Sequence, residues 1–206
     1  MTPWVEADEM PPPPMSKTTG RPIRPKAHQA KLAFLDIEFL GWPIDPNLIT
    51  EVGVWLAEEP APVTWKIRPN PDYLAEIERN NPDLWTSIQK ASEVNGFTQE
   101  AWADAPHWMD ARLPIAQTIY KRRLVGVNVF DADIKRLSAM FHPWDEGWIA
   151  PHTAYDLQPL ARFLGHESVK LDALCEVYGI EGETIHTAEG GVRRVRAVAE
   201  KMLRRD

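Results

Sequence analysis

LAFLDIEFLGW, residues 32–42, is the most strand-like stretch of the chain, and two acidic residues, Asp36 and Glu38, lie within it. Side chains at positions i and i+2 of a strand project from the same face, so we expect the two carboxylates to lie side by side. Burying two such charges is costly unless something compensates for them. A divalent cation such as magnesium, which prefers oxygen ligands, would do so. The alternative explanation is an edge strand whose polar face lies in water.

The segments around this stretch predict an α/β layout. Residues 31–39, 48–57 and 63–69 have the composition of strands and are separated by turn-rich segments, which favours an antiparallel three-strand meander. Two further strands are expected at 123–130 and 153–157. Apolar spacing of three and four residues predicts helices at 71–80, 82–95, 98–122, 131–141, 158–165, 169–180 and 187–205. We therefore expect a mixed five-stranded sheet flanked by helices.

The chain has 206 residues, which favours one main domain. Residues 1–30 are rich in proline and lack apolar periodicity, so we expect a disordered tail followed by a folded domain at 31–206. A net charge of −7 argues against coating nucleic acid by bulk attraction, and the single Cys175 excludes both an internal disulfide and a cysteine metal site. No secretory signal or membrane span is visible, and cytoplasmic residence is the default expectation.

Two more features contain residue types that are common in active sites. Asp131 and Asp133 follow the expected strand at 123–130 and open a helix, at the carboxyl end of a strand where open α/β sheets place ligands. Acids in a first helical turn also have a plain structural role, since they suit the helix dipole. His186 precedes the last helix, where it could act as a base or simply cap the helix.

These segments resemble, in order and across residues 31–206, the three motifs of the DnaQ-like exonucleases of the DEDDh class, which have the RNase H-like fold. FLDIEFLG resembles the first motif and is followed by ITEVGV, a similar second strand. LVGVNVFDADIKRL resembles the second motif. KLDALCEVYGI followed by HTAEGGVRRVRAVAEKML resembles the third.

The chain departs from the family pattern at two places. One residue is missing between Asn128 and the Phe-Asp pair, so either Asp131 or Asp133 could be the ligand, and we favour Asp131 because it keeps that pair. The last family aspartate falls on Gly191. Glu189 is the nearest carboxylate that could substitute, although it lies about 200° away around a helix.

The resemblance implies a 3′–5′ exonuclease that hydrolyses phosphodiester bonds by a two-metal mechanism, with an activity impaired by Gly191. Two Mg²⁺ or Mn²⁺ ions would be held by Asp36, Glu38 and Asp131, and His186 would be the base. The alternative is a catalytically inactive nucleic-acid-binding domain of the same fold. The expected partners are a single-stranded nucleic acid 3′ end and, as an additional candidate, a polymerase. The residues expected to contact the substrate are Phe39, Leu40, Trp42, Asn128 and Arg193.

Overall fold

A mixed five-stranded sheet forms the centre of the fold, with the strand order β3-β2-β1-β4-β5. The computed structural model describes residues 32–141, 154–182 and 186–203. The strands are β1 (Leu32–Phe39), β2 (Ile49–Leu56), β3 (Val63–Lys66), β4 (Arg123–Gly126) and β5 (Ala154–Asp156). β1 to β3 form an antiparallel meander, whereas β4 is parallel to β1 and β5 is parallel to β4. The predicted five-stranded sheet is therefore confirmed, and the predicted tail at residues 1–30 lies outside the described residues.

Short connections explain the antiparallel pairs. β1 and β2 are joined by a turn that contains the short 3₁₀ helix η2 (Pro46–Leu48), where the Asp45 carboxylate accepts a 2.8 Å hydrogen bond from the amide of Asn47. β4 and β5 instead follow helical segments, as parallel strands require a crossover connection.

The helices are α2 (Pro71–Asn80), α3 (Pro82–Asn95), α4 (Trp108–Ile119), α5 (Lys135–Phe141), α6 (Leu157–Phe163), α7 (Leu171–Tyr178) and α8 (Ala188–Leu203). α2 and α3 each begin with a proline after an asparagine whose side chain caps the first turn. The helix predicted over 98–122 is shorter in the structure, because Pro106 disfavours helical backbone at the residue before it. The helix predicted from 131 is also different: a wide π-helical segment, η3 (Phe130–Ile134), precedes α5.

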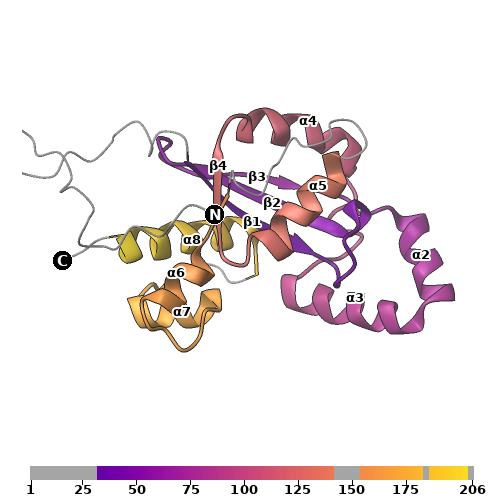
Figure 1. Ribbon diagram of the computed structural model, residues 1–206. Helices are drawn as coiled ribbons and strands as arrows, with labels where there is room; N and C mark the ends of the chain where they lie inside the picture. Colours follow the sequence, from indigo (N-terminus) through magenta and orange to yellow (C-terminus); the bar gives the residue numbers. More distant parts are fainter. Residues whose placement is uncertain (1–31, 142–153, 183–185, 204–206) are drawn as a thin grey trace, which may run out of the picture.

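The alternation of β1 divides the core into two layers. Ala33, Leu35 and Ile37 pack in one cluster with residues of α4 and α5. Phe34 packs in a second cluster with residues of α6, α7 and α8 on the opposite face. Figure 1 shows α4 and α5 on one side of the sheet, with α6, α7 and α8 on the other. Beyond the end of β1, Leu40 joins a third cluster with α2 and α3.

Helix α8 lies very close to β2 at its N-terminal end. A Cβ atom at Gly53 would lie 2.3 Å from the carbonyl oxygen of Ala188, so only glycine allows this approach. The other half of α8 presents Val195, Val198 and Ala199 to the second cluster. The first turn of α8 is therefore held directly over the face of the sheet that carries Asp36.

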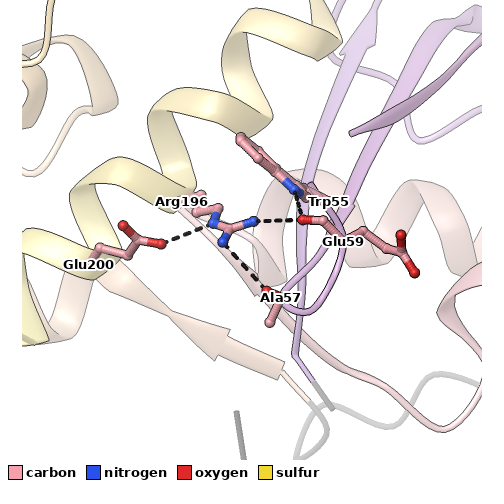
Figure 2. A network of polar contacts seen from close by, with 5 residues as sticks. All are labelled: Trp55, Ala57, Glu59, Arg196 and Glu200. Atoms are coloured by element: carbon pink, nitrogen blue, oxygen red, sulfur yellow. Dashed lines mark hydrogen bonds and ion pairs between the residues drawn. The ribbon is translucent and has the colours of Figure 1, made fainter. Parts of the chain in front are cut away.

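Arg196 ties the C-terminal half of α8 to the end of β2 (Figure 2). Its guanidinium donates to the Glu200 carboxylate at 3.0 Å and to the carbonyl oxygens of Ala57 and Glu59 at 3.4 and 3.5 Å. It also lies 4.2 Å above the ring of Trp55, whose indole nitrogen donates to the same Glu59 carbonyl at 2.9 Å. None of the helices in the described ranges is long and apolar enough to cross a membrane.

Candidate active site

A row of carboxylates lies at the face of the sheet covered by the start of α8. Asp36 and Glu38 project from β1, and Glu51 of β2 is the register partner of Glu38. Directly paired residues of an antiparallel ladder share a face and have Cβ atoms about 4.5–5.5 Å apart. The predicted juxtaposition of Asp36 and Glu38 is extended by a third acid that the motifs did not single out.

Asp133 adds a carboxylate from the neighbouring η3 segment. Its side chain is buried, and the backbone amide of Ile37 on β1 hydrogen-bonds to it. Asp131 is exposed instead and forms a 2.6 Å ion pair with the Nζ of Lys135. The structure therefore places Asp133, and not the favoured Asp131, beside Asp36.

The backbone of η3 explains this outcome. The amide of Ile134 donates to the carbonyl of Val129, five residues earlier, at 2.8 Å. Such a widened turn changes which side chains face the sheet compared with a regular α-helix. The Phe-Asp pair that favoured Asp131 is still present in the sequence, but its aspartate faces outward.

The carboxylates perturb one another strongly. Burial, followed by the charge of Glu38, raises the pKa of Asp36 to about 8, while the Arg194 guanidinium acts in the opposite direction. Burial and the charge of Glu51 raise the pKa of Glu38 to about 7. Burial and the charge of Asp36 also raise the pKa of Asp133 well above its usual value. The site thus concentrates more negative charge than its surroundings neutralise.

Gly191 lies directly against Asp36. A Cβ atom at position 191 would lie 2.0 Å from Oδ2 of Asp36, so this carboxylate fills the space that any side chain on Gly191 would need. Glu189 does not replace the missing acid in this arrangement. Its carboxylate accepts a 2.8 Å hydrogen bond from Nη2 of Arg193, four residues further along the exposed side of α8.

His186 lies in the turn that leads into α8. It is exposed and has a positive φ of 60°, an uncommon backbone conformation for a residue other than glycine. Two residues later the amide of Ala188 donates to Oε2 of Glu51 at 3.1 Å. That hydrogen bond holds the beginning of α8, and with it the turn that carries His186, at the acidic row.

The residues expected to contact a substrate have different environments. Trp42 is 76% exposed, and Phe39 is partly buried with the Arg136 guanidinium 3.3 Å above its ring. Leu40 is fully buried in the third core cluster, so it cannot contact a ligand as the structure stands. Arg136 is itself buried and donates to the carbonyls of Gly41 and Trp42, which fixes the loop after β1.

Asn128 and Arg193 lie on separate elements of the site. Asn128 has a positive φ of 60°, and its backbone amide donates a 3.0 Å hydrogen bond to Oδ1 of Asp156. The same Oδ1 of Asp156 caps the first turn of α6 through the amide of Gln158. The Arg193 side chain lies over Trp55 at 5.2 Å and lines a cleft together with Glu51.

Sequence reasoning missed Glu51 as a part of the site. Glu51 required the strand register, which no local pattern supplies, although its place in the strand ITEVGV was a partial signal. Arg194 is buried and donates to the carboxylate of Asp172 and to Sγ of Cys175 at 3.4 Å. It supplies the positive charge that partly offsets the acids of β1.

The donor chemistry of this site fits a hard divalent cation, because the donors are carboxylate oxygens that repel one another. Their present positions do not make a finished site: within the described residues, no group of three or more His, Cys, Asp or Glu side chains could hold a metal ion. The Asp36 carboxylate lies against α8 at Gly191.

The fold is shared with solved exonuclease I structures. One exonuclease I structure superposes with a TM-score of 0.66 at 20% identity, covering 84% of this chain and 40% of that one. The zinc-bound complex of E. coli exonuclease I with single-stranded DNA gives a TM-score of 0.62 at 22% identity, with the same coverage. Exonuclease I of Methylocaldum szegediense gives 0.62 at 18% identity, also with coverages of 84% and 40%.

The chain thus spans about 40% of the length of the solved proteins that it matches. No protein-family model matches it. No curated protein matches it either. The structural similarity confirms the predicted α/β fold, a mixed five-stranded sheet flanked by helices, as the fold of these exonuclease I structures.

Proposed function

We propose that this domain is a divalent-metal-dependent exonuclease that hydrolyses the terminal phosphodiester bond at the 3′ end of single-stranded nucleic acid. The observation that carries the proposal is that Asp36, Glu38 and Glu51 share one face of the sheet while Asp133 of η3 lies beside Asp36, in the fold of exonuclease I. One of the similar solved structures is a complex of E. coli exonuclease I with single-stranded DNA.

The carboxylates would hold Mg²⁺ or Mn²⁺, with Asp36, Glu38 and Asp133 as ligands and Asp131 outside the site. A pair of such ions supplies an activated water and stabilises the leaving oxygen of an in-line displacement. Glu51 holds the start of α8 through Ala188 and adds a fourth negative charge to the cation site. Gly191 leaves the second ion with one carboxylate fewer, so we expect a slower reaction than in a site with five carboxylates.

His186 would take the proton from the attacking water. Its imidazole is exposed in the turn before α8, and histidine is the side chain that most often serves as a general base. Trp42 offers an exposed aromatic face beside the site for stacking on a terminal base, a contact worth about 1–3 kcal/mol. A polymerase partner remains a prediction from the family resemblance.

The second candidate is an inactive domain of this fold that still binds nucleic acid ends. The arrangement of Asp36 against Gly191, with no finished metal site among the described side chains, favours this alternative. It differs from the enzyme in one respect that can be measured: binding would occur without shortening.

The test uses single-stranded DNA and RNA oligonucleotides, each labelled at the 5′ or the 3′ end, with Mn²⁺ or Mg²⁺. We expect a ladder from the 5′-labelled strand and early release of a single labelled nucleotide from the 3′-labelled strand, both abolished by chelator. Binding without shortening would support the inactive domain. Release that begins at the 5′ end would contradict the proposed direction.

A further inference from the structure

A cleft of about 430 Å³ adjoins the acidic row on the side of the edge strand β3. We call it the β3 cleft, and the lining residues used below are Glu51, Thr64, Lys66, Trp102, Thr187 and Arg193. Its floor is the sheet, one wall is the first two turns of α8, and the opposite wall includes Trp102. Glu51 belongs to both the cleft and the acidic row.

The strand register connects the two sites. Glu38 pairs with Glu51, and Glu51 pairs with Lys66, so the three side chains form one row across β1, β2 and β3. Paired residues of antiparallel strands share a face of the sheet. The row therefore changes from acidic to basic over two strand spacings, or about 10 Å.

Lys66 is held in place by an aromatic ring. Its ammonium lies 4.2 Å from the centroid of the Trp102 ring. That ring is 6% exposed and is itself fixed, because its indole nitrogen donates to the carbonyl of Thr50 at 3.0 Å. Among the described residues, no carboxylate lies within ion-pair distance of Lys66. The Lys66 ammonium therefore has a fixed position from which it can bind an anion.

Arg193 is the second basic side chain of the cleft. The guanidinium of Arg193 is oriented by Glu189, with hydrogen bonds of 3.1 and 2.8 Å to the same oxygen. Thr64 and Thr187 also line the cleft, and the Thr187 hydroxyl accepts a 3.1 Å hydrogen bond from the backbone amide of Gly190. Glu189, a further lining residue, is paired with Arg193, so the two basic side chains suit a phosphate group better than an apolar ligand.

We propose that the β3 cleft binds a phosphate group of nucleic acid, with Lys66 and Arg193 as its two cationic contacts. The inference rests on the proposed function, because it takes the acidic row as the place of reaction. Lys66 and Arg193 would then hold the chain of phosphates about one nucleotide away from the bond to be hydrolysed. The same chemistry could come from the strand itself or from a released nucleoside monophosphate.

The experiment compares Lys66→Gln, Arg193→Gln and the double variant with Lys121→Gln. Lys121 is a matched control, since it is also exposed and lies 5.0 Å from the centroid of an aromatic ring, Tyr120, but it precedes β4, which is three strands away from β3 in the sheet. Binding of a fluorescent single-stranded oligonucleotide is measured by anisotropy with Ca²⁺ in place of Mg²⁺ or Mn²⁺, over a range of salt concentrations. Shortening is measured separately with Mn²⁺.

We expect Lys66→Gln to weaken oligonucleotide binding about 5- to 10-fold and to reduce the slope of log K against log salt by about 0.7. In the shortening assay, KM rises by a similar factor while kcat changes less than twofold. The double variant is weaker again, and Lys121→Gln matches the wild type. Competition by a nucleoside monophosphate identifies the source of the phosphate: loss of competition in Lys66→Gln indicates the terminal nucleotide, and unchanged competition indicates the strand.

Two results overturn different statements. If Lys66→Gln and the double variant bind and shorten the oligonucleotide as Lys121→Gln does, the cleft inference is wrong and the proposed function stands. If the wild type binds in a Lys66-dependent way but shortens nothing, the cleft inference stands and the exonuclease proposal is wrong.

Discussion

The N-terminal half of helix α8 lies against polar groups of β1 and β2, whereas its C-terminal half packs on apolar side chains of the same face. At the first end, Gly191 lies against the Asp36 carboxylate and the Ala188 amide binds Glu51. At the other end, Val195 and Val198 pack in the second core cluster. The start of α8 thus lies against carboxylates that repel one another, whereas the rest of the helix stabilises the fold through apolar contacts.

The difference between the two halves of α8 explains how the fold tolerates several carboxylates close together. Carboxylates with raised pKa values, such as Asp36 and Glu38, reduce the free energy of unfolding once they are ionised. The apolar contacts and the Arg196 network at the C-terminal half (Figure 2) offset that cost without entering the site. Such a division is typical of functional sites, which are less stable than the structure that supports them.

Removing the central carboxylate should have the largest effect. We predict that Asp36→Asn lowers the Mn²⁺-dependent shortening rate on the order of 10²–10³-fold, a loss comparable to removing one group that stabilises developing charge in other enzymes. The matched control is Asp131→Asn, which removes an exposed acid of the same motif and should change the rate less than about threefold, because a surface ion pair contributes little. Equal losses in the two variants would contradict the placement of Asp131 outside the site.

The contact between Gly191 and Asp36 should produce the next largest effect. A methyl group at position 191 meets a short, partly buried side chain, so we predict that Gly191→Ala lowers the free energy of unfolding by about 1–3 kcal/mol. In an Asp36→Ala background the same change should cost less than about 0.5 kcal/mol, since the obstructing carboxylate is gone. Urea unfolding of the four proteins gives the coupling energy. Additive effects would mean that the contact carries no strain.

Gly191→Asp tests the same position for function. The new carboxylate can enter only if that of Asp36 turns away, and it adds a further negative charge beside the acids of β1. We therefore expect Gly191→Asp to be less stable than the wild type in chelator, to recover with Mn²⁺, and to shorten oligonucleotides faster. Recovery of stability without a faster rate would indicate that another part of the site is missing.

Cation binding should stabilise the protein more at high pH than at low pH. In the unfolded chain Asp36 and Glu38 lose their protons near pH 4, but in the fold they keep them up to about pH 8 and about pH 7. The folded state then binds more protons than the unfolded state, so stability falls as pH rises between these limits.

A bound divalent cation replaces those protons. We predict that Mn²⁺, at ten times the dissociation constant measured at pH 8, stabilises the protein by about 1.4 kcal/mol at pH 8, and that the same concentration stabilises it by much less at pH 5, where protons compete. Thermal unfolding with and without Mn²⁺ measures both values, and Asp36→Asn should remove most of the difference. The same Mn²⁺ shift at both pH values would contradict a cation site built on these carboxylates.

The parts of this site that follow from local periodicity could be predicted, and the parts that depend on tertiary geometry could not. Asp36 and Glu38 share a face because strands alternate with a period of two. Asp133 faces inward because η3 is wound as a π-helix, and no pattern in FDAD distinguishes that from an α-helix. Predicting that Glu51 joins the site would have required the β1–β2 register. Predicting the contact between Gly191 and Asp36 would have required the close approach of α8 to the sheet, which Gly53 allows.

The smallest effects should come from the C-terminal half of α8. Arg196→Met keeps most of the side chain over Trp55 but removes its hydrogen bonds to Ala57, Glu59 and Glu200, so we predict a loss of about 1 kcal/mol in the free energy of unfolding. Glu200→Gln removes only the charge from an exposed pair and should change that free energy by less than about 0.5 kcal/mol. Both variants should shorten oligonucleotides at the wild-type rate under conditions where they are folded. If Arg196→Met instead abolishes shortening while remaining folded, the two halves of α8 are coupled, because a change at the stabilising end must then have moved Gly191 relative to Asp36.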